Sequence, residues 1–311
     1  MEMDILSLLL VVLGLCAFEV ISSIDNAVVN ADVLATMSEK ARKWFLVWGI
    51  FFGVFLVRGL LPWLIVYMAN PSLGPVGALT ATFSNDPRIM ESVEKSAPLL
   101  LIAGGIFLIF LFLHWLFLEE KSFGLSMEKF FSKHGVWFFA VASILLSLII
   151  WFALQRDPLL AFAATIGSTA FFIIYGFKEQ AVKAELALQK NAGLTDMSKL
   201  LYLEVLDATF SIDGVVGAFA FTMSVPLIIF GNGLGALVVR QFTISGVESI
   251  RKYSYLKNGA MYSILFLGCI MLSESFGLDV PSYLSPLITF GVIGFFLAKS
   301  IIANGKAKQS A

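Results

Sequence analysis

The sequence predicts an all-α fold, a polytopic transmembrane helical bundle of about nine spans. Of its 311 residues, 59% are hydrophobic and 14% are charged, and the charged residues cluster between long apolar runs. Each run is close to the roughly 20 residues that cross a hydrocarbon core of about 30 Å. A soluble core of this size could not bury so much apolar surface. The formal net charge of −1 gives no indication of a nucleic-acid partner.

The first apolar run lacks the basic start and small-residue cleavage site of a signal peptide, so we expect a retained span. Eight further apolar runs follow it. The joints near residues 155 and 224 are very short, so either flanking pair could instead be a re-entrant hairpin, which leaves eight spans as the alternative. The nine predicted spans are 5–34, 44–68, 98–118, 136–154, 158–176, 199–223, 226–244, 259–275 and 284–303.

Three other segments carry predictions of their own. The segment 69–97 is rich in Pro and Gly, which predicts an irregular loop. In 177–198, charges of alternating sign are separated by apolar residues, as in a helix that lies on a membrane surface. The tail 304–311 is expected to be disordered.

The distribution of Lys and Arg predicts the orientation in the membrane. With the N-terminus outside, 16 of these residues, Lys178 among them, fall on the cytoplasmic side and three fall outside. We therefore expect a multi-pass protein of the bacterial inner (plasma) membrane with a cytoplasmic C-terminus. The lipid bilayer is the expected partner, and the oligomeric state is left open.

Two acidic motifs interrupt the apolar runs. Glu19 precedes the triplet Ser23-Ile24-Asp25 by four residues, and Asp207 precedes Ser211-Ile212-Asp213 by the same distance. A carboxylate in the middle of a bilayer costs about 2.5–3.5 kcal/mol on insertion scales. Two such motifs at matching positions predict a polar site that is built from two related halves.

The similarity between the halves extends to the following spans. The segment 53–58 ends in Arg58 and resembles the segment 235–240, which ends in Arg240. Five crossings separate the two acidic spans, so the repeat is inverted, as in many secondary transporters. The whole chain, 1–311, then forms a single transmembrane domain. It consists of repeat A (about 5–118), central spans with a linker (about 119–198) and repeat B (about 199–303).

Helical periodicity places Glu19 and Asn26 on one face, and likewise Glu204, Asp207 and Ser211 on another. Asp25 and Asp213 follow Glu19 and Asp207 by six residues, about a third of a turn away from these faces. An unwound Ser-Ile-Asp turn would bring each acidic pair together and free backbone carbonyl groups as ligands.

Oxygen donors suit hard divalent cations such as Mn²⁺, Ca²⁺ and Mg²⁺. Five acids against two arginines leave three negative charges at low dielectric, which calls for a bound cation or for protons. This predicts a divalent cation as substrate, in exchange for protons, with no prosthetic group and no enzymatic activity. The predicted metal-site residues are Glu19, Asp25, Asn26, Glu204, Asp207, Ser211 and Asp213, with Arg58 and Arg240 as charge-pairing residues.

These residues resemble the TerC family of integral membrane proteins, within the LysE-type transporter superfamily. The similar pieces are 19–26, 204–213 and 231–240, which together cover about a third of the chain. The extra central spans, and Gly214 in place of the usual Ser, indicate a divergent TerC-related subfamily. The resemblance implies metal-ion transport, first of all Mn²⁺ efflux, with a link to tellurium resistance.

Other interpretations stay open. Other members of the superfamily export amino acids or other small solutes. For that activity, Arg58 or Arg240 would have to face the cavity without an acidic partner, so that it could bind the carboxylate of the substrate. A non-transporting membrane partner of metal or tellurite stress proteins would make the acids dispensable. The acids could also be structural partners of the two arginines, and Ser211 could bond its own helix backbone.

Overall fold

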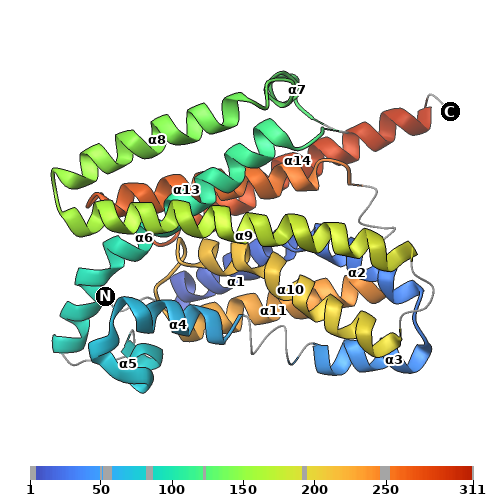
Figure 1. Ribbon diagram of the computed structural model, residues 1–311, viewed down its shortest axis with the longest axis horizontal. Coiled ribbons are helices and arrows are strands. Elements are labelled where there is room, and N and C mark those ends of the chain that lie inside the picture. Colours follow the sequence, from blue (N-terminus) through green and yellow to red (C-terminus); the bar gives the residue numbers. More distant parts are fainter. Residues whose placement is uncertain are drawn as a thin grey trace.

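The computed structural model describes residues 5–49, 51, 58–81, 87–121, 124–190, 195–245 and 253–309 (Figure 1). Some side chains within these helices, including that of Asp25, lie outside the description. Every regular element in the described ranges is helical, so the predicted all-α class is confirmed. The longer helices are α1 (Ile5–Ser22), α2 (Ile24–Ala35), α4 (Leu60–Ala69), α6 (Pro87–Leu118), α8 (Trp137–Leu154), α9 (Pro158–Lys190), α10 (Asp196–Ala218), α11 (Val225–Ser245), α13 (Leu256–Ser275) and α14 (Leu284–Gln309). The short elements are α3 (Glu39–Trp44), the π-helical turn η1 (Phe45–Gly49), the 3₁₀ turn η3 (Pro71–Leu73), α5 (Gly74–Thr80) and α7 (Ser126–Ser132).

Seven of the described helices are long and apolar enough to cross a membrane: α1, α6, α8, α9, α11, α13 and α14. The protein is thus a polytopic helical bundle. Two predicted spans are not among the seven. The span 44–68 includes residues outside the description, and α10, which corresponds to 199–223, carries Glu204, Asp207 and Asp213 on a less apolar sequence. The count of nine stays a prediction.

The joint between α8 and α9 shows how the sequence makes a tight turn between two full-length helices. Pro158 opens α9, where its missing N–H costs nothing, and Asp157 Oδ1 accepts a hydrogen bond of 2.8 Å from the backbone N–H of Leu159. Both helices are long and apolar enough to cross the membrane, which favours two spans over a re-entrant hairpin.

Three segment predictions were wrong. Residues 177–190 of the expected surface helix continue α9 without a break, because no Pro or Gly interrupts the helix-forming sequence there. The expected loop 69–97 contains η3, α5 and the first turns of α6, which runs through Pro98. The tail is helical as far as Gln309, as part of α14.

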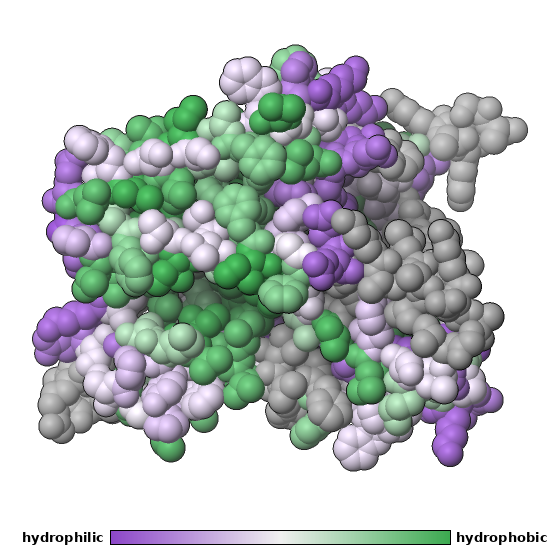
Figure 2. All heavy atoms as spheres, in the orientation of Figure 1, coloured by the Kyte–Doolittle hydropathy of each residue, from purple (hydrophilic) through white to green (hydrophobic). Residues whose placement is uncertain are grey.

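The outer surface of α8 has the character of a lipid-facing helix. Trp137, Ile144 and Trp151 are each at least 60% exposed, although they are large and apolar. Figure 2 shows a broad hydrophobic area over this face of the molecule, with hydrophilic residues gathered toward its left edge and its upper right. The helices run between these two edges in Figure 1, as expected for spans that cross a bilayer.

Two glycine contacts set the distances between the central helices. A Cβ atom at Gly105 of α6 would lie 3.0 Å from the carbonyl oxygen of Gly268 of α13, and the reverse distance is 3.1 Å. On α11, Gly231 and Gly235 leave no room for a side chain against Leu15 and Glu19 of α1. These two glycines therefore let α1 and α11 pack closely.

Candidate functional site

The two acidic motifs meet where α10 runs antiparallel to the α1–α2 pair. Asn26 Nδ2 of α2 donates a hydrogen bond of 2.6 Å to Asp207 Oδ1 of α10. A second contact joins Glu19, seven residues before Asn26, to Gly214, seven residues after Asp207. A Cβ atom at Gly214 would lie 2.6 Å from Glu19 Oε2. When the two motifs are aligned, Glu19 corresponds to Asp207 and Asn26 corresponds to Gly214. Each of the two contacts is therefore the counterpart of the other. This reciprocity is the geometry that an inverted repeat produces.

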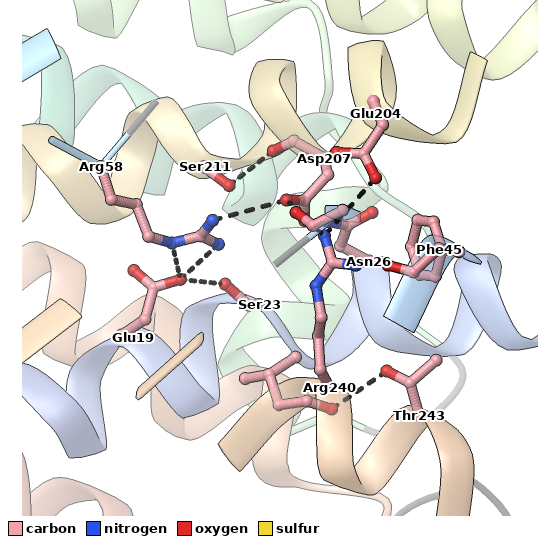
Figure 3. Close-up of polar contacts among 12 residues, drawn as sticks. Glu19, Ser23, Asn26, Phe45, Arg58, Glu204, Asp207, Ser211, Arg240 and Thr243 are labelled. Carbon is pink, nitrogen blue, oxygen red and sulfur yellow. Dashed lines mark hydrogen bonds and ion pairs between the residues drawn. The ribbon is translucent and has the colours of Figure 1, made fainter. Parts of the chain in front are cut away.

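Arg58 joins the two motifs. Its Nε and Nη2 atoms donate to Glu19 Oε1 at 2.9 and 2.7 Å, and its Nη1 donates to Asp207 Oδ2 at 3.4 Å (Figure 3). Ser23 adds a hydroxyl donor to the same Glu19 oxygen, at 2.7 Å. Arg58 is 2% exposed and Glu19 is fully buried. The guanidinium therefore compensates two carboxylates in a buried setting, where an unpaired charge would be very costly.

Arg240 approaches Asp207 from α11. Its Nη2 atom lies 3.7 Å from Glu204 Oε1 and 3.8 Å from Asp207 Oδ2. The Nη1 atom of Arg240 donates to the backbone carbonyl of Phe45 at 2.7 Å, and its Nη2 atom donates to that of Gly49 at 2.6 Å. The guanidinium also lies over the Phe45 ring, 4.3 Å from its centroid. The π-helical turn η1 supplies these carbonyls, because widened turns leave some oxygens outside the regular i to i−4 pattern. Both arginines, expected from the sequence as charge-pairing residues, thus contact carboxylates or backbone carbonyls.

Asp213 faces away from this cluster, toward α9. Its Oδ2 forms a close ion pair with Nζ of Lys178, and both side chains are nearly buried. The sequence placed Lys178 beyond the end of its span, among the cytoplasmic charges, whereas the structure pairs it with Asp213 of α10. Because α9 continues as a helix past the predicted end of its span, Lys178 is in a position to reach Asp213.

The expected unwinding of the motifs is largely absent. α10 is a continuous helix through Ser211 and Asp213. In the first motif only Ser23 interrupts the helix, and backbone hydrogen bonds from Ser23 to Glu19 and from Ala27 to Ser23 persist at 3.1 and 2.9 Å. Asp213 consequently stays a third of a turn away from Asp207, as the helical period requires.

The predicted metal-site residues come together only in part. Glu19, Asn26, Glu204 and Asp207 surround the two arginines, whereas the Ser211 hydroxyl donates to the carbonyl of Asp207 in its own helix. The side chain of Asp25 lies outside the described residues. Among the side chains that are described, no group of three or more His, Cys, Asp and Glu is placed to hold a metal ion. Each described acid instead lies within ion-pair distance of one of three cations, Arg58, Arg240 and Lys178.

Several buried oxygens of this region nevertheless have no hydrogen-bond partner within the described structure. They are Glu19 Oε2, Asn26 Oδ1, Glu204 Oε1, Asp213 Oδ1 and Asn232 Oδ1. Asn232, on α11, is fully buried, and its Nδ2 lies 3.5 Å from the carbonyl oxygen of Gly214. Buried acceptors without donors are rare in folded proteins and often mark functional sites.

Sequence reasoning missed Lys178 and the carbonyls of η1. The signal for Lys178 was a helix-forming stretch after residue 176 with no breaker, which allowed a longer helix than the 20-residue minimum. No comparable signal marked Phe45 and Gly49, because backbone carbonyls carry no residue identity.

Comparison with known proteins identifies relatives by sequence. The sequence model of one family, described as "Protein of unknown function (DUF475)", matches residues 24–307. A protein named "Uncharacterized membrane protein" from Rickettsia prowazekii (strain Madrid E) is 26% identical over 103 residues, 33% of this chain and 34% of that protein. Another from Myxococcus xanthus is 29% identical over 112 residues, 36% of this chain and 34% of its own length. The chain thus spans about a third of these curated relatives, and no solved structure matches it.

Proposed function

This chain belongs to the DUF475 family, and from that premise we propose that it is a transporter that exports a divalent cation, with Mn²⁺ as the first candidate. The proposed site lies at the two acidic motifs, and its described carboxylates are those of Glu19, Glu204, Asp207 and Asp213. We further propose the inner membrane as its location and protons as the exchanged ion. The resemblance to TerC proteins at the motifs supports Mn²⁺ over other divalent cations.

One observation carries the proposal: acidic residues from distant parts of the chain meet between antiparallel helices and share the guanidinium of Arg58. Intramembrane acids at such a meeting point are typical of ion pathways. The reciprocal contacts of Glu19 with Gly214 and of Asn26 with Asp207 support an inverted repeat, the arrangement that alternating access uses.

Charge compensation leaves room for a cation. The four described carboxylates, Glu19, Glu204, Asp207 and Asp213, face three cations, Arg58, Arg240 and Lys178, so one negative charge remains. Asp25, next to the helix break at Ser23, would raise the excess to two if ionised. That is one less than the sequence suggested, because Lys178 pairs with Asp213. An excess of two matches a single divalent ion.

The amino-acid-exporter alternative is weaker on this geometry. It needs a guanidinium that is free to bind a substrate carboxylate, and both arginines already bind carboxylates or backbone carbonyls.

The test is transport by purified protein in liposomes that enclose a Mn²⁺-sensitive dye. Asp213→Asn and Asp25→Asn should each abolish Mn²⁺ flux, since removing a negative ligand lowers divalent affinity while the neutral amide inserts more easily. Glu39→Gln is the matched control, because the Glu39 side chain is 82% exposed and remote from the motifs. Parent-like flux in both Asn variants would refute the cation site, and flux of an organic solute instead would favour the exporter alternative.

A further inference from the structure

The carboxylate of Glu19 uses only one of its two oxygens. Oε1 accepts hydrogen bonds from Nε and Nη2 of Arg58 at 2.9 and 2.7 Å and from the Ser23 hydroxyl at 2.7 Å. Oε2 has no hydrogen-bond partner within the described structure, although Glu19 is fully buried. Its counterpart Asp207 differs, because one carboxylate oxygen accepts from Asn26 and the other from Arg58. Glu19 therefore has an oxygen left for a ligand.

Asn232 of α11 brings a second such oxygen to the same place. The residue is fully buried, and its Oδ1 has no hydrogen-bond partner among the described residues. Asn232 and Glu19 both contact Gly214 of α10: Asn232 Nδ2 donates to its carbonyl oxygen at 3.5 Å, and a Cβ atom there would lie 2.6 Å from Glu19 Oε2. One turn further along α11, a Cβ atom at Gly235 would lie 2.6 Å from Glu19 Cβ. Asn232 therefore lies where α11 packs against Glu19.

Two buried acceptors at one glycine need a partner that brings positive charge or hydrogen-bond donors. Oxygens of an ionised carboxylate and of an amide accept hydrogen bonds and donate none, so the two groups cannot satisfy each other. Such oxygens are the ligands that hard divalent cations prefer. The hydrogen bonds to Glu19 Oε1 favour a cation over an ordered water molecule, because carboxylates that bind metal ions are typically held by further hydrogen bonds.

We propose that Asn232 is a ligand of the transported divalent cation, which its Oδ1 binds together with Glu19 Oε2. This inference rests on the proposed function and adds a residue to its site. Arg58 holds the Glu19 carboxylate through Oε1, and Asn232 contributes an oxygen that carries no charge. When 53–58 is aligned with 235–240, the position that corresponds to Asn232 is Ile50, so the sequence supplies this amide in only one of the two repeats.

The experiment measures Mn²⁺ affinity and stability on the same variants. MnCl₂ is titrated calorimetrically into the purified full chain in detergent, and the melting temperature is measured without Mn²⁺. Asn232→Leu keeps the branched shape of the side chain and removes the oxygen. It should weaken Mn²⁺ binding by about 10–100-fold or more, since even residues that only support a metal ligand are worth that much. Its melting temperature should not fall, because the variant removes a buried acceptor that has no donor.

Asn258→Leu is the matched control. Asn258 of α13 is also buried, but its amide donates a hydrogen bond of 2.7 Å to Glu128 of α7, away from the acidic motifs. This control should lower the melting temperature, because it leaves a buried carboxylate oxygen without its donor, and it should bind Mn²⁺ like the parent. Asn232→Asp tests the site in the opposite direction: a negative ligand in place of the amide should strengthen Mn²⁺ binding.

The outcomes distinguish this inference from the proposed function. A parent that binds no Mn²⁺ refutes the proposed function. A parent that binds Mn²⁺ while Asn232→Leu binds it equally well refutes the ligand role alone, and the two oxygens then share a water molecule or serve the fold. If Asn232→Leu does not fold, an Asn232→Asp variant whose Mn²⁺ affinity is no higher than that of the parent is the refuting result.

Discussion

Glu19 of α1 and Asp207 of α10 accept hydrogen bonds from one guanidinium group, that of Arg58. Removing a partner from a buried ion pair is far more damaging than replacing the whole pair, because the remaining charge is left without compensation. The stability of the bundle should therefore depend on the balance within this trio.

Arg58→Gln should lower the free energy of unfolding by about 3–5 kcal/mol, because it leaves two buried carboxylates uncompensated. Adding Glu19→Gln to that variant should restore part of the loss. Denaturant or thermal unfolding in detergent measures both changes. Lys43→Gln is the control, since the Lys43–Glu39 pair is largely exposed and worth about 0–1 kcal/mol. An Arg58→Gln variant as stable as Lys43→Gln would contradict the prediction.

Gly214→Ala should destabilise the protein by about 1–3 kcal/mol, because the new methyl group would lie 2.6 Å from Glu19 Oε2. Gly176→Ala of α9 is a matched control: a Cβ there meets nothing within 4 Å, and Ala favours a helix over Gly by up to about 1 kcal/mol. The two variants should thus shift the unfolding transition in opposite directions. A shift of equal sign and size would show that Glu19 does not pack against Gly214.

Lys121, just beyond the end of α6, should make stability depend on pH. Burial lowers the pKa of its ammonium from 10.5 to about 8, although it lies 3.8 Å over the Trp115 ring. Between those two pH values the unfolded state binds more protons than the folded state, so this group adds stability as pH rises from about 8 toward 10.5. The melting temperature of Lys121→Met, compared with the parent at each pH, isolates the effect. A difference that stays constant over this range, or grows as pH falls through 8 in favour of the parent, would contradict it.

The sequence predicts the bundle well because apolar length and charge clustering are local properties. It also identifies Glu19, Asp207, Arg58 and Arg240, since a charge within an apolar run needs a partner wherever the chain folds. The partner of each arginine follows from helix packing, which one sequence does not reveal.

The remaining errors come from helix ends and from the backbone. Lys178 lies two residues past the predicted end of its span, and ends are the least certain part of such a prediction. The helix is interrupted at Ser23 but continues through Ser211, although both residues begin the same Ser-Ile-Asp triplet. The triplet alone therefore does not determine the break.

The crossing of α6 and α13 has a mechanical consequence. At Gly105 and Gly268 each backbone sits where the other's side chain would be, while Ile109 and Leu108 fill the flanks of the contact. Sliding one helix along the other would drive those larger side chains into the backbone, whereas a small rotation about the contact would not. The crossing therefore acts as a pivot: it resists translation between the two halves of the bundle and leaves tilting as the easier motion.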